Sequence, residues 1–177
     1  MRLLGIVLLV VVLIAGALAV FAPASLADRA IEANSQGRLR VADTTGTLWS
    51  GGGTLTDAGN TWRMPLRWTI PPRSLLRATH ELVLEPAPGM TLPTGTVGIG
   101  KDSGNLRDFA IEVPAQALAG TLRGVTLGGT VTVRTAAFDW NASGATGSLA
   151  AQWRNARLAV GGAVANLGAV DVALAPD

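Results

Sequence analysis

The chain offers few side chains that can do chemistry, and the most versatile of them is its single histidine, His80. A lone histidine can act as a general base or bind a metal, but both roles normally require a neighbouring carboxylate, thiol or second imidazole. His80 alternates with Leu82 and Leu84, a pattern typical of a strand. The chain has no cysteine and no tyrosine. We therefore predict a protein that is not an enzyme, without catalytic, cofactor-binding or metal-binding residues.

A glycine-rich stretch at residues 95–102 matches a phosphate-binding loop as far as Gly-x-x-x-x-Gly-Lys. The motif next requires a Ser or Thr hydroxyl for magnesium, but Asp102 occupies that position. Its carboxylate would repel phosphate, and the prolines before the stretch argue against the strand, loop and long helix that the motif needs. We interpret residues 95–102 as a glycine-rich β-hairpin.

The elements that would position any site begin with residues 3–21, which contain no charge, amide or hydroxyl. At ~1.5 Å per helical residue this run can cross a ~30 Å hydrocarbon layer. Residues 1–22 are therefore predicted to form a transmembrane anchor with a short cytoplasmic start, because Arg2 and the amino terminus favour a cytoplasmic N-terminus. A cleaved signal peptide stays open as an alternative, since Ser25 and Ala27 fit a small-x-small cleavage site.

Charge argues against a nucleic-acid partner. Fourteen basic residues stand against twelve acidic ones, giving a net charge of +2. The sequence pI of about 10.4 reflects the excess of arginine over lysine, and no long basic run occurs. Without cysteine, the protein must be stabilised by burial and backbone pairing.

The remaining chain divides into a stalk at residues 23–37 and a β-domain at residues 38–177. Within the stalk, a short helix is predicted with Leu26, Ala30 and Ala33 on one side. Beyond it, short alternating runs are separated by Gly, Thr, Asn and Pro. The fold class is thus predicted to be all-β, a curved antiparallel sheet or open half-barrel preceded by one transmembrane helix.

The clearest strand pattern lies at residues 62–70. One face of this strand carries a tryptophan at each of positions 62 and 68, and the other face carries two arginines. We expect both tryptophans to fill the core. Pro65 lacks an amide hydrogen and predicts an edge position or a bulge. Helical turns are predicted at residues 71–78 and 115–119, each beginning at or just after a proline.

Three stretches of the chain form a recognisable set: VADTTGTLWSG at 41–51, MPLRW at 64–68 and GSLAAQWRNARL at 147–158. Together they resemble protein N of the bacterial type II secretion system. The resemblance implies a single-pass inner-membrane protein with a periplasmic β-domain, an accessory of the secretion machinery without catalytic residues. Members of that family continue with further strands, whereas this sequence ends soon after residues 170–174. We expect either a short member of the family or a sheet left open at its last strand and completed by a partner.

From these residues we expect protein-protein interaction in the periplasm with other type II secretion subunits, in the inner membrane or the secretin. Trp49, Ser50 and Gly51 are the candidate partner contact, because tryptophans often dominate interfaces. The opposing interpretation is that Trp49 covers the open end of the sheet. An alternative function is a membrane-tethered periplasmic carrier that binds a lipid or another apolar ligand on a concave sheet.

Overall fold

The computed structural model describes residues 11, 16, 20–77, 79–118, 125–161 and 163–175. Most of the predicted anchor, residues 1–22, lies outside these described residues. Among the residues that are described, no helix is long and apolar enough to cross a membrane.

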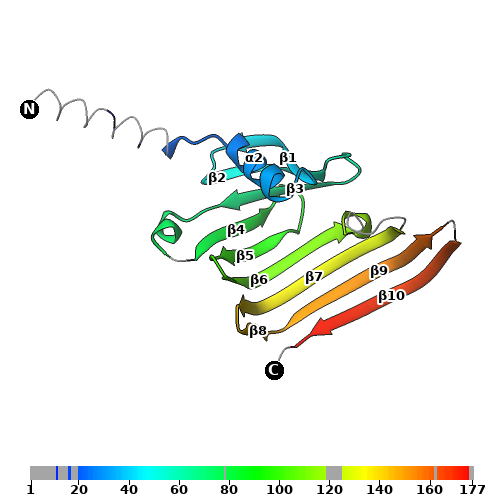
Figure 1. Ribbon diagram of the computed structural model, residues 1–177. Coiled ribbons are helices and arrows are strands. Elements are labelled where there is room, and N and C mark those ends of the chain that lie inside the picture. The colour runs from blue at the N-terminus through cyan, green and yellow to red at the C-terminus, as the bar shows by residue number, and fades with distance from the viewer. Residues whose placement is uncertain are drawn as a thin grey trace, which may run out of the picture.

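The described chain forms one antiparallel sheet of ten strands (Figure 1). Their order is β1 to β7, then β9 and β10, with the short β8 pairing only with β7. The all-β class and the antiparallel sheet are confirmed, and within the described residues β1 and β10 are edges that do not meet. The strands are β1 (Leu39–Gly46), β2 (Ser50–Asp57), β3 (Arg63–Thr69), β4 (His80–Pro86), β5 (Thr94–Ile99), β6 (Ser103–Pro114), β7 (Val125–Asn141), β8 (Gly144–Gly147), β9 (Leu149–Val160) and β10 (Ala163–Leu174).

Strand β3 has the two faces that its sequence predicts. Trp62 just before it, and Met64 and Trp68 within it, are buried, whereas its arginines are exposed. The strand lies inside the sheet, yet its ladder with β4 begins only at Leu66 opposite Pro86. Pro65 therefore lies beside a locally free edge, where a missing amide hydrogen costs no ladder bond.

One apolar face continues across the sheet, because residues directly opposite each other in neighbouring strands point to the same side. At one end, Leu82 of β4 lies opposite Val97 of β5, which lies opposite Leu106 of β6. The register of β6 with β5 shifts near Asp108, which has a φ of +46°, so residues 109, 111 and 113 of β6 point to the same face as Leu106. From there two rows cross β6, β7, β9 and β10. One row contains Val113, Val131, Trp153 and Val170, and the other contains Ile111, Val133, Ala151 and Val172.

The helix α2 (Ser25–Asn34) covers the apolar face at the β1 end of the sheet (Figure 1). Ala24 joins Val41 and Trp68 in the buried cluster, and Ala27 and Ile31 of the helix pack against it. The predicted short helix is present, and the three residues that the sequence places on one side of it are exposed: Leu26, Ala30 and Ala33. The segment predicted as a stalk thus packs on the sheet.

The shorter features follow the sequence closely. A 3₁₀ turn, η1 (Pro72–Leu76), joins β3 to β4, and a second, η2 (Ala115–Ala117), follows β6. The glycine-rich stretch that matched part of a phosphate-binding loop forms the β5–β6 hairpin, with the Gly100 amide donating to the Ser103 carbonyl at 2.8 Å. A hairpin has no helix N-terminus for a phosphate, so the nucleotide motif is absent here.

Candidate functional site

The predicted contact residues Trp49, Ser50 and Gly51 lie where β1 turns into β2. The turn is closed on itself: the Thr47 amide donates to the Ser50 carbonyl at 2.9 Å, and the Ser50 amide donates to the Thr47 hydroxyl at 3.1 Å. The Trp49 carbonyl accepts the Ile70 amide at 2.7 Å. We call this turn, residues 46–51, the corner.

The corner holds the N-terminal segment onto the sheet. Pro23 forms a β-bridge with Thr47, and the Leu48 amide donates to the Ala22 carbonyl at 2.8 Å. On the other side, the Ala24 amide donates to the Gly46 carbonyl at 3.3 Å. Ala22 and Ala24 are both buried. The corner therefore fixes the entry of the chain immediately before α2.

Two glycines allow the corner to close. Gly46 has a φ of +82°, a conformation that L side chains rarely adopt. A Cβ on Gly51 would come within 2.6 Å of the ring of Trp68 and 2.8 Å of two carbonyl oxygens. Trp68 in turn donates its indole N–H to the Leu48 carbonyl at 3.0 Å. The order Gly-Thr-Leu-Trp-Ser-Gly thus has a structural explanation.

The side chains of the corner differ in exposure. Leu48 and Trp49 are half-buried, and Ser50 is exposed. Beside them, an open hollow of about 470 Å³ includes Gly52 and Arg67 in its lining. The corner thus has a half-buried tryptophan, and its Ser50 and Gly51 line a shallow hollow that also contains Asp43 and Glu85.

The opposite, polar face of the sheet holds a cluster that the sequence did not reveal. The Glu112 carboxylate accepts hydrogen bonds from Arg154 at 2.8 Å and from Thr132 at 3.2 Å. The only sequence signal is that each residue falls on the polar phase of its strand, and register places them together. Such a partly exposed ion pair contributes little to stability.

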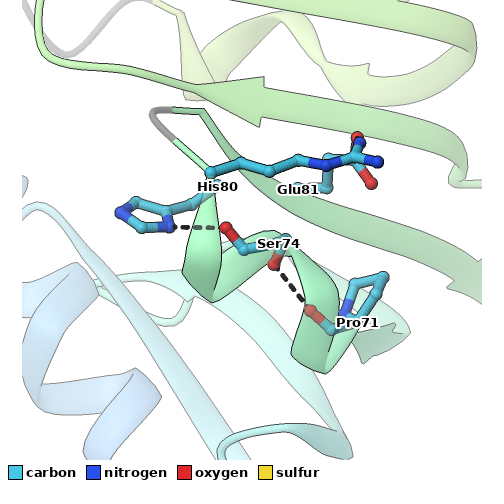
Figure 2. A network of polar contacts seen from close by, with 5 residues as sticks. Pro71, Ser74, His80 and Glu81 are labelled. Carbon is cyan, nitrogen blue, oxygen red and sulfur yellow. Dashed lines mark hydrogen bonds and ion pairs between the residues drawn. The ribbon is translucent and has the colours of Figure 1, made fainter.

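His80 begins β4 beside η1 (Figure 2). It is exposed, and its Nδ1 lies 3.3 Å from the backbone carbonyl oxygen of Ser74. The Ser74 hydroxyl, which a catalytic pair would use, donates to the Pro71 carbonyl at 2.7 Å instead. Glu81 next to the histidine forms an ion pair with Arg77 at 3.1 Å. The contacts of His80 are those of a residue that joins a turn to a strand.

The pKa shifts found in the described chain arise from local hydrogen bonds. Slight desolvation raises the pKa of Asp57, but hydrogen bonds from the hydroxyl and amide of Thr61 outweigh it and hold this pKa below 3.8. The hydrogen bond to Asp139, 2.6 Å long, raises the pKa of Arg107. Asp57 lines an open hollow of about 650 Å³ whose described lining contains no histidine and no second carboxylate. Over the described residues, no group of three or more His, Cys, Asp or Glu residues is placed to hold a metal ion.

Comparisons with protein-family models, with curated proteins and with solved structures found no match to this chain. The assignment of a function therefore depends on the chain's own residues and geometry.

Proposed function

We propose that the protein is an accessory inner-membrane component of the type II secretion machinery that acts through protein-protein contacts in the periplasm. The observation that carries the proposal is the corner. The same Gly-Thr-Leu-Trp-Ser-Gly stretch that carries the family resemblance joins the N-terminal segment to the sheet, keeps Trp49 half-buried, and lines an open hollow with Ser50 and Gly51. A tryptophan at a rigid corner is a suitable anchor for a protein contact.

The membrane part of the proposal comes from the sequence. Residues 3–21 are long and apolar enough to span the bilayer with the amino terminus in the cytoplasm. Because the corner binds Pro23 directly, a span ending near Phe21 would hold the start of the sheet at the membrane surface. The corner would then face partners that are themselves embedded in or bound to the inner membrane.

A photo-crosslinking amino acid in place of Trp49 tests the proposal in the envelope of the native bacterium. We expect adducts that contain an inner-membrane or secretin subunit of the secretion machinery. The matched control places the same amino acid at Met90, which is 48% exposed in the β4–β5 connection, and should give no such adduct. The proposal is refuted if position 49 yields no secretion subunit while the variant remains in the membrane.

A membrane-tethered lipid carrier is a second candidate, favoured by the apolar face of the sheet. The rows through Trp153 and Ala151 extend to the β10 edge, whereas α2 covers the face only at the β1 end. Apolar sheet surface of this kind can shield an acyl chain. Mass spectrometry of protein purified in mild detergent should then detect a stoichiometric lipid, and a lipid-free preparation would count against a carrier.

A further inference from the structure

The fold blocks one edge of its sheet with side chains and a helix. At the β1 edge, Asp28 of α2 accepts the Val41 amide at 2.8 Å, and the Ser35 hydroxyl accepts the Leu39 amide at 3.0 Å. Asp43, with a φ of +53°, lies within an irregularity of the same strand. Edges that are covered, bulged or occupied in this way do not pair with another chain.

The β10 edge has almost none of these protections. β10 pairs with β9 on its inner side, and no described residue pairs with its outer side (Figure 1). Eleven of its twelve residues are exposed. The strand has no proline, lysine or arginine, Asp171 is its single charged residue, and one irregularity at Gly168 interrupts its register. A long edge with this composition favours strand pairing.

The irregularity at Gly168 changes which residues of β10 point to the apolar face. After it, Val170 lies opposite Trp153, and therefore Val172 and Leu174 also point to that face. Before it, Ala165 lies opposite Leu158, which lies opposite Leu127, so Ala163 and Ala165 share the face. Val170, Val172 and Leu174 thus occupy the apolar face in one half of the strand, and Ala163 and Ala165 occupy it in the other half, with Leu167 beside the irregularity.

We propose that the β10 edge pairs with β10 of a second copy of this chain, antiparallel, about a two-fold axis between Gly168 and Ala169. An axis perpendicular to the sheet keeps both apolar faces on one side and makes the contact self-complementary. All twelve residues of each strand are then paired. Towards the ends of the strand the pairing places large against small, Leu174 opposite Ala163 and Val172 opposite Ala165, and near the axis it places Leu167 opposite Val170.

The charges fit the same register. Asp171 lies on the polar face, where Gln152 already donates to it at 3.0 Å, and the pairing places it opposite Asn166 of the second copy. A register that placed Asp171 opposite Asp171 of the second copy would bring two negative charges directly together, which is unfavourable. The occupant is a second copy because β10 itself supplies the length, the alternation and the complementary sizes that this edge requires. The inference does not depend on the role in secretion.

The first test is the mass of the full chain in detergent micelles, corrected for bound detergent. We expect twice the chain mass of 18.1 kDa for the wild type. The single-chain mass is expected for Val172→Lys, because a charge on this 58% exposed side chain would lie within the paired face. Met90→Lys, at an exposed site in the β4–β5 connection and not on the β10 edge, should stay dimeric. A single-chain mass for the wild type at every concentration overturns the proposal.

The second test uses the absence of native cysteine to fix the register. Ala165→Cys and Val172→Cys chains with different tags are produced together in bacterial membranes and oxidised. Directly opposed residues in antiparallel strands have the spacing that a disulfide requires, so a mixed dimer should form. The control pair, Ala165→Cys with Ala173→Cys, places the thiols on opposite faces and should give about tenfold less, since the geometry forbids the bond.

Equal yields from the two pairs would refute the register. A disulfide from position 172 to another protein, without any mixed dimer, would show that a different chain occupies the edge and would refute the proposed second copy. Both readouts are independent of secretion, so either proposal can fail while the other stands.

Discussion

Replacing Gly51 by alanine tests the tight packing of the corner. The new Cβ would lie 2.6 Å from the ring of Trp68 and 2.8 Å from the carbonyl oxygens of Thr45 and Thr47. Two of these contacts are with backbone, which cannot rotate away, and Trp68 is buried in the core cluster. Overpacking of this kind costs about 1–3 kcal/mol. For a chain of this size that cost lowers the melting temperature by about 2–12 °C.

The adjacent Gly52 is the matched control. Its Cβ would find no atom closer than 3.4 Å, which is ordinary contact. Gly52→Ala should therefore change the free energy of unfolding by less than about 0.5 kcal/mol, as at other unconstrained surface sites. Thermal unfolding of the full chain in mild detergent, followed by far-UV circular dichroism, measures both variants. Equal melting temperatures for Gly51→Ala and Gly52→Ala would refute the packing described for the corner.

Three further variants test the contacts of α2, the pH dependence and the role of the histidine. Asp28→Ala should lower the free energy of unfolding by about 1–3 kcal/mol, because the buried Val41 amide loses its acceptor. The control Arg29→Ala, on the exposed side of the helix, should leave the free energy of unfolding unchanged. Thermal melts measure both variants. Asp57→Asn should lower the free energy of unfolding at pH 7. The pKa of Asp57 is lowered in the folded state, so the stability from its charged form is present above the unfolded pKa and is lost as the pH falls. The difference in stability between Asp57→Asn and the wild type should therefore shrink in melts taken below pH 3.8. A deficit that is constant with pH would contradict this assignment. His80→Ala should shift the melting temperature by no more than about 2 °C and leave export unchanged, since the exposed ring has one weak contact; a loss of export would show a role that its contacts do not explain.

The sequence pattern of a single segment was sufficient to predict the structure wherever that segment alone decides which side chains are buried or where the chain turns. The period of two around Trp62 and Trp68 predicted the buried face of β3, and the misplaced Asp102 together with its prolines predicted a hairpin in place of a phosphate-binding loop. Pro72 at the start of η1 likewise followed from the fixed φ of proline. In each case the deciding residues are neighbours in sequence.

Contacts between distant segments were not predictable in the same way. The face of α2 that packs on the sheet depends on where β1 and Trp68 lie, so Leu26 remains 38% exposed while Ala24 and Ile31 pack inward. Asp28 accepts the Val41 amide, thirteen residues away, and no pattern within its own segment predicts that contact. The change of face at Gly168 depends on the register with β9, which no single-strand pattern contains.

The proposed role of this protein, a non-catalytic contact protein of type II secretion, is tested most directly by measuring export from a strain that lacks the gene. The measurement is the fraction of a folded secreted enzyme that reaches the medium. We predict that this fraction falls and that the enzyme accumulates in the periplasm, with export restored by the wild-type chain and by His80→Ala. Unchanged export in the deletion strain would contradict the account.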